Sequence, residues 1–146
     1  MRETHIESDL ELMFPPTYIP NDSERVSLYR ELDKMEEERD ILAFTERLKD
    51  RFGKIAKEGK ELIRVGRLRR KAKRLGMEKI VLKKGQMNLF LVSNPDSPYY
   101  QSEAFDKLLR FIQKHPRECN LREQNGKRSI IIKNVQTVET ACCHLE

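Results

Sequence analysis

Apolar residues recur at helical spacing along the first half of the chain. In YIPNDSERVSLYRELDKM, the side chains of Val26, Tyr29 and Leu32 fall on one side of a helix that we expect over residues 23–35. Residues 21–23 supply polar side chains of the kind that cap a helix start. Before them, the alternation LELMF precedes two prolines and is typical of a short strand.

Two further helices are predicted next. EERDILAFTERLKDRFG ends at Gly53, a residue suited to a helix C-cap, and repeats apolar positions on one helix face. These positions are Ile41, Phe44, Thr45, Leu48 and Phe52. A third helix is expected from about residue 56 to Leu75, because Gly76 is a stop signal directly after its last apolar position.

The second half of the chain changes period. MEKIVL and MNLFLV are β-rich and flank KKGQ, in which Gly85 can supply the positive φ of a tight turn. CNLRE and KRSIIIKNV flank Asn125-Gly126, a stronger hairpin signal. Between the two hairpins, residues 105–112 have helical spacing and Pro116 ends the helix. The tail QTVETACCHLE predicts a final helix.

These elements predict an α+β fold, in which N-terminal helices precede two β-hairpins with an intervening helix. The chain has 146 residues, of which 38% are hydrophobic, and this is enough for one compact core. We therefore expect residues 1–146 to form a single domain. No apolar run approaches the ~20 residues of a membrane span, and the N-terminus is acidic where a signal peptide would be basic and then apolar. These features predict a cytoplasmic protein.

The net charge of +5 conceals a strong segregation of charge along the chain. Residues 1–50 carry a net charge of −7, residues 51–84 of +11 and residues 85–146 of +1. The chain is therefore a charge dipole more than a uniformly basic protein. Two surfaces of opposite sign suit reversible docking, which electrostatics can orient.

Motifs for catalysis are sparse. The chain has neither a P-loop nor a Gly-x-Gly-x-x-Gly fingerprint, and its three histidines are isolated along the sequence. Cys142 and Cys143 are adjacent, and neighbouring side chains on a helix diverge by about 100°, so they rarely share a metal ion. The acidic run of residues 36–38 is interpreted as a solvated helix start. We expect reduced thiols, no metal, no cofactor in this domain and no enzymatic activity.

The stretch RVGRLRRKAKRLG, residues 64–76, holds seven basic side chains. On a helical wheel its apolar residues form a sector wide enough to seat the helix on a core, and most basic residues fill the other half. A solvated helix face explains this pattern without a ligand. The alternative is a duplex-DNA-binding module that contacts phosphates and loses affinity steeply with salt. Its contact residues would be Arg64, Arg67, Arg70, Lys71, Lys73 and Arg74.

Arg69 is the exception on this wheel, because it falls inside the apolar sector. An unpaired guanidinium would be costly there, so we expect an acidic or carbonyl partner. The second helix offers Glu46 and Asp50. A bidentate bond from Arg69 to either carboxylate would fix the register of one helix on the other.

Three motifs follow one another along the helical half of the chain. They consist of Ile19, Pro20, Asp22, Arg25 and Tyr29; of Asp50, Arg51, Phe52 and Gly53; and of Arg67, Leu68, Arg69, Ala72, Leu75 and Gly76. In this order and spacing they resemble the C-terminal domain of the bacterial transcription-repair coupling factors, the ATP-driven DNA translocases also called Mfd. The resemblance covers nearly the whole chain and is strongest from about residue 10 to residue 80.

The resemblance implies a regulatory, non-catalytic domain. In that family the domain follows the motor, to which ATP and Mg²⁺ belong, and folds back on the N-terminal UvrB-like module. There it covers the surface that recruits the excision-repair protein UvrA and keeps the resting translocase inhibited. The resemblance further implies that the domain is released when RNA polymerase and DNA engage the motor.

The same resemblance implies a docking role for acidic residues of the second helix. Asp50 matches one of these acids. Three residues earlier, where the family pattern can place a second acid, the chain has Arg47, and Glu46 lies one step aside. Asp50 then has two candidate roles, because one carboxylate cannot fully serve both Arg69 and an exposed interface.

The wheel predicts that Arg69→Ala lowers the thermal unfolding midpoint clearly more than Arg70→Ala does. Arg69 falls among apolar positions and Arg70 on the basic half, so only the first substitution should remove a desolvated ion pair. Thermal unfolding followed by circular dichroism compares the two variants. Equal midpoints would contradict the assignment of Arg69 to a buried pair.

Overall fold

The computed structural model describes residues 4–146, which divide into two compact units. A helical unit covers Glu11–Leu68, and a sheet unit combines the N-terminal segment up to Leu10 with Arg69–Glu146. The predicted α+β class is confirmed. The expectation of one domain over residues 1–146 stays a prediction.

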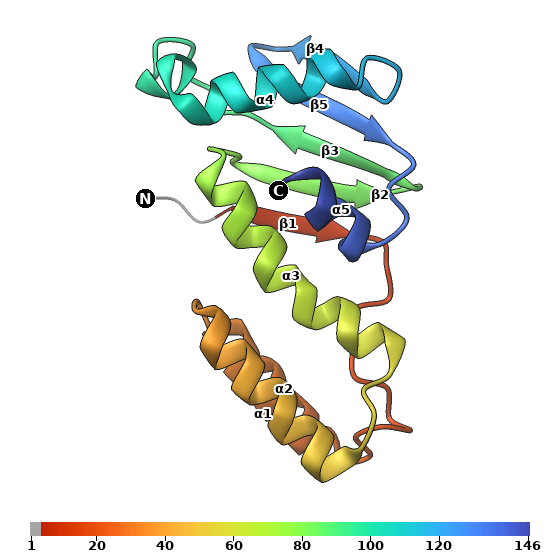
Figure 1. Ribbon diagram of the computed structural model, residues 1–146. Helices are drawn as coiled ribbons and strands as arrows, with labels where there is room; N and C mark the ends of the chain where they lie inside the picture. The colour runs from red at the N-terminus through yellow and green to blue at the C-terminus, as the bar shows by residue number, and fades with distance from the viewer. Residues whose placement is uncertain (1–3) are drawn as a thin grey trace. The chain divides into compact units, whose positions relative to one another are not determined.

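The helical unit contains three helices, as predicted (Figure 1). They are α1 (Asp22–Asp33), α2 (Glu38–Phe52) and, up to Leu68, α3 (Lys57–Arg74). The side chain of Asn21 caps α1 by accepting a hydrogen bond from the Glu24 amide at 2.9 Å. Gly53 ends α2 at a φ of 85°, which favours glycine. The predicted ends of these helices therefore lie within two residues of the observed ones.

A loop residue lies at the centre of the helical core. Phe14 is fully buried, and its ring lies 5.4 Å from the Tyr29 ring and 6.3 Å from the Phe44 ring, measured between centroids. The other buried members are Ile19, Ile41, Phe44, Leu48, Ile55 and Ile63. The strand predicted from LELMF is wrong, because the chain there turns Phe14 into the core and forms no ladder; the strand lies earlier, at His5–Ser8.

The described residues of the sheet unit form five strands in the order β1-β2-β3-β5-β4 (Figure 1). The strands are β1 (His5–Ser8), β2 (Lys79–Lys83), β3 (Gln86–Phe90), β4 (Cys119–Gln124) and β5 (Lys127–Lys133). β1 pairs with β2 in parallel, with Ile6 opposite Ile80, whereas the other neighbours are antiparallel. The sequence reasoning did not foresee that this N-terminal strand joins the sheet.

Both predicted hairpins are confirmed. Lys84 and Gly85 have φ values of 54° and 72°, and Asn125 and Gly126 have values of 54° and 75°. Two central residues with positive φ define the turn that matches the natural twist of paired strands. The two turns thereby set the register of β2 on β3 and of β4 on β5.

The sheet buries alternate side chains on one face. Across the three neighbouring strands, Ile80 lies opposite Leu89, which lies opposite Ile130, and all three are fully buried. The unit also contains the short 3-10 helix η1 (Pro98–Gln101), α4 (Glu103–Lys114) and α5 (Val138–His144). α4 and α5 are in contact through the rings of Phe111 and His144, whose centroids lie 5.7 Å apart. The predicted intervening and final helices are therefore present.

We predict that Gly76→Ala destabilises the protein by about 2 kcal/mol or more, and that Gly126→Ala costs only about 1 kcal/mol. Both glycines have a φ near 75°, but a Cβ at Gly76 would come within 2.3 Å of the Tyr99 ring, whereas a Cβ at Gly126 would meet nothing within 4 Å. Tyr99 packs on Tyr100 and Phe105, so it cannot yield freely. Urea unfolding of both variants measures the difference, and equal losses would contradict it.

Candidate docking surface of the helical unit

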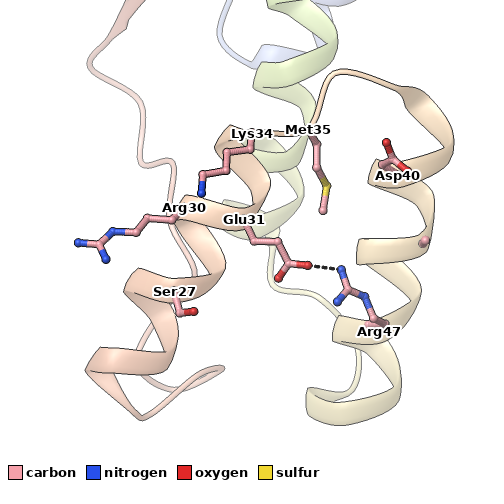
Figure 2. A pocket seen from close by; sticks show the side chains of 8 residues that line it. Ser27, Arg30, Glu31, Lys34, Met35, Asp40 and Arg47 are labelled. Carbon is pink, nitrogen blue, oxygen red and sulfur yellow. Dashed lines mark hydrogen bonds and ion pairs between the residues drawn. The ribbon is translucent and has the colours of Figure 1, made fainter.

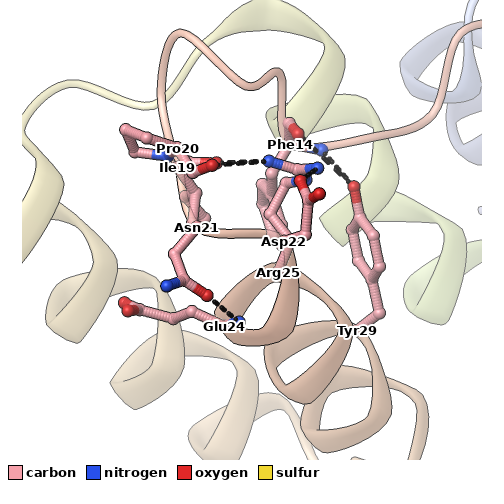
Figure 3. Close-up of polar contacts among 8 residues, drawn as sticks. All are labelled: Phe14, Ile19, Pro20, Asn21, Asp22, Glu24, Arg25 and Tyr29. Atoms are coloured by element: carbon pink, nitrogen blue, oxygen red, sulfur yellow. Dashed lines mark hydrogen bonds and ion pairs between the residues drawn. The ribbon is translucent and has the colours of Figure 1, made fainter.

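The first family motif builds a clamp at the start of α1 (Figure 3). The Arg25 guanidinium donates to the carbonyl of Ile19 at 2.7 Å and pairs with the carboxylate of Asp22. Its side chain is only 17% exposed. A charged group that is held this deeply needs these partners, which fix the loop before α1 against the helix itself.

Two tyrosines extend this clamp. The Tyr29 hydroxyl accepts a hydrogen bond from the Phe14 amide at 2.9 Å, as Figure 3 shows, while the two rings stack. The Tyr18 hydroxyl donates to the carbonyl of Gly53 at 2.7 Å. The loop is thus tied to α1 at one point and to the end of α2 at another.

The second motif, Asp-Arg-Phe-Gly, divides into structural residues and one outward acid. Arg51 pairs with Glu24 of α1 at 3.0 Å, the Phe52 ring lies 5.7 Å from the Tyr18 ring, and Gly53 is both the C-cap and the acceptor for Tyr18. Asp50 is exposed and forms no ion pair within the helical unit. Contacts within the helical unit therefore account for three residues of the motif, Arg51, Phe52 and Gly53, but give no structural role to Asp50.

Glu46, the other predicted docking residue, lies on the same exposed face of α2. Its carboxylate is 3.4 Å from the ammonium group of Lys49, and both side chains are at least half exposed. A pair this exposed contributes little to stability. Residues 42, 46 and 50 are four apart and share one helix face, so the candidate docking surface is the outer stripe of α2 formed by Leu42, Glu46, Lys49 and Asp50.

Arg47 does not belong to that stripe. Its guanidinium pairs with the Glu31 carboxylate of α1, as the dashed line in Figure 2 shows. The pair crosses an open hollow of about 640 Å³ between α1 and α2, where Met35 also points inward. The residue that departs from the family pattern is therefore engaged with α1.

The basic residues of α3 that belong to the helical unit are paired. The Arg67 Nε atom donates to both carboxylate oxygens of Glu38, at 2.8 and 3.1 Å. Arg64 donates to Glu61 at 3.2 Å, and Glu61 is 7% exposed. Neither arginine is the freely solvated group that the helical wheel suggested, because carboxylates of α2 and α3 already hold them.

In the sheet unit, the Lys71 ammonium group lies 3.7 Å from the carboxylate of Glu146, while Lys73 is half-buried and Arg74 is exposed. Arg69 and Arg70 are half-buried. Arg69 belongs to the sheet unit and its two candidate partners to the helical unit. A pairing of Arg69 with Glu46 or Asp50 stays a prediction.

The described residues offer few side chains that could bind a metal ion or act as a nucleophile. Among residues 4–146, no group of three or more His, Cys, Asp or Glu side chains could hold a metal ion. Burial raises the pKa of the Cys119 thiol, and the nearby Glu118 adds to the effect, so the reactive thiolate is disfavoured. Within residues 4–146, no helix is long and apolar enough to cross a membrane.

The α+β fold and the three sequence motifs define a domain whose family can be identified by comparison with known sequences. The sequence model of the TRCF domain matches residues 8–102, and the chain belongs to this family. The match includes the clamp, the whole of α2 and α3, and the first hairpin.

Two known proteins are similar to this chain. The transcription-repair-coupling factor of Escherichia coli (strain K12) is 26% identical over 121 residues, which cover 82% of this chain and 10% of that protein. The chain therefore spans about a tenth of the length of this relative. A crystal structure of the C-terminal domain of transcription-repair coupling factor has the same fold, with a TM-score of 0.74 over 99% of this chain and 90% of that one at 14% identity.

Sequence reasoning missed the carboxylates that hold the basic face. Glu61 lies three residues before Arg64, a spacing that brings side chains together on a helix and that could have indicated the pair. Glu38 was interpreted only as part of a solvated helix start, although it also binds Arg67. Its partner is 29 residues away in the sequence, and no local spacing reveals such a pair.

The clamp predicts that Arg25→Ala lowers the free energy of unfolding by about 2 kcal/mol, because the substitution leaves the carbonyl of Ile19 without its charged donor. Arg30→Ala, on the same helix but exposed, should change it by less than about 0.5 kcal/mol. Urea unfolding of the two variants provides the comparison. Similar losses would show that the Arg25 contacts do not support the fold.

Proposed function

We propose that this chain is a non-catalytic, regulatory domain of a transcription-repair coupling factor, a DNA translocase that releases stalled RNA polymerase. In this proposal α2 docks on the N-terminal UvrB-like module of the same protein and masks its UvrA-binding surface. Family membership supports the context. UvrA, RNA polymerase and DNA would then be reached only through the parent protein, during nucleotide excision repair.

The observation that carries the proposal is the isolation of Asp50. The residues that follow it, Arg51 to Gly53, each have a contact that stabilises the helical unit, whereas the Asp50 side chain is exposed. A carboxylate that does nothing for its own fold is available to an external cation. An exposed charge pair of this kind orients an encounter without making it irreversible, which suits a contact that a partner must later break.

The proposal also accounts for the sparse chemistry of the chain. Tyr99 and Cys119 have raised pKa values because they are buried, and buried groups of this kind are poor candidates for proton transfer at neutral pH. ATP and Mg²⁺ would act in the motor of the parent protein. The domain would contribute an interface and no catalytic group.

The competing function is duplex-DNA binding by the basic helix. Its predicted contacts include Arg64, Arg67 and Lys71, which already pair with Glu61, Glu38 and Glu146. Binding phosphates would require these pairs to be exchanged, so each contact would contribute less affinity than a free cation. The ion pairs therefore favour the docking proposal over the DNA proposal.

We predict that the 146-residue chain binds the isolated N-terminal UvrB-like module of the translocase from the same organism. Asp50→Arg should weaken this binding at least about tenfold, because it replaces an attraction across the interface by a repulsion. Isothermal titration at low ionic strength measures both affinities. Asp96→Arg is the matched control, since Asp96 is an exposed loop acid of the sheet unit.

The possible results separate the alternatives. Binding that is lost with Asp50→Arg and kept with Asp96→Arg supports the docking surface. Equal weakening by both variants would point to net charge alone. An absence of binding at high protein concentration, together with a shift of duplex DNA by the same chain, would favour the basic helix.

A further inference from the structure

Leu42 is exposed where α2 has no structural need for an apolar residue. The buried side of α2 consists of Ile41, Phe44 and Leu48, and each is at most 2% exposed. Leu42 points away from that side and is 53% exposed. A single exposed leucine is ordinary by itself, so the residues around it decide its meaning.

Two ion pairs flank Leu42, one within α2 and one at its start. Arg39 pairs with Glu37 at 2.7 Å, and Lys49 lies 3.4 Å from Glu46. These pairs leave two groups on the outer stripe without a counterpart in the helical unit, one apolar and one anionic. They are Leu42 and Asp50.

We propose that Leu42 is the apolar anchor of the docking surface, and that the partner carries an apolar depression and a Lys or Arg side chain placed to match. The inference rests on the proposed docking of α2. Asp50 lies eight positions after Leu42, and a helix rises 1.5 Å per residue, so the depression and the cation should lie about 12 Å apart along the helix axis. The partner surface is thus specified by chemistry and by spacing.

The two groups make different physical contributions. The attraction between Asp50 and a cation at the rim is screened by salt, with a Debye length of ~8 Å at physiological ionic strength. Removal of Leu42 from water is not screened in this way. Asp50 should therefore govern the orientation and salt dependence of binding, and Leu42 the part of the affinity that persists at high salt.

The test measures binding of the full 146-residue chain to the N-terminal module at about 0.05 M and about 0.5 M salt. Leu42→Ala should weaken binding about five- to tenfold, and the factor should be similar at both salt concentrations. Asp50→Asn should weaken it mainly at the lower one. Val26→Ala is the matched control, because Val26 is a 46% exposed aliphatic residue on α1, and it should leave the affinity unchanged.

Each result bears on one claim. If Asp50→Asn weakens binding but Leu42→Ala and Val26→Ala behave alike, the anchor is wrong and the docking proposal stands. If the loss with Leu42→Ala disappears at high salt, Leu42 is not an apolar anchor. If the wild-type chain does not bind at all, the docking proposal fails and the anchor fails with it. Unfolding curves that match the wild type exclude a loss of structure as the cause.

Discussion

The clamp around Arg25 is the constraint on which the helical unit depends. A guanidinium that is mostly withdrawn from water is satisfied by a backbone carbonyl and a neighbouring carboxylate, and it thereby fixes the loop that precedes α1. The same loop inserts Phe14 into the core and sends Tyr18 to the end of α2. Because the loop contacts both α1 and the end of α2, it helps to fix the position of α2, together with the packing of the helices.

A fixed α2 presents a fixed outer face. Its inner side supplies apolar residues to the core, Arg47 and Arg51 bind α1, and the residues of the outer stripe are exposed. Within that stripe Glu46 and Lys49 pair with each other, and this sets Asp50 and Leu42 apart from them. The proposed regulation thus uses a rigid scaffold to present one carboxylate and one apolar side chain, an arrangement that a competing partner can displace.

The helices and both hairpins were predictable, because they depend on periodicity and on turn residues such as Asn125 and Gly126. The parallel pairing of β1 with β2 was not, since it joins segments more than 70 residues apart and leaves no local signal. The family motif located Asp50 in the sequence, but only the contacts of Arg51 and Tyr18 showed which residues of that motif are structural. The pairing of Arg67 with Glu38 escaped the helical wheel for the same reason, because a wheel represents one helix without its neighbours.

Amide resonances of the isotope-labelled chain, recorded while the unlabelled N-terminal module is added, test the central claim most directly. The account predicts shifts concentrated on the outer stripe of α2, at Leu42, Glu46, Lys49 and Asp50. Amides of β4 and β5 should remain in place. Shifts confined to the basic residues 64–74, or to the sheet unit, would contradict docking through α2.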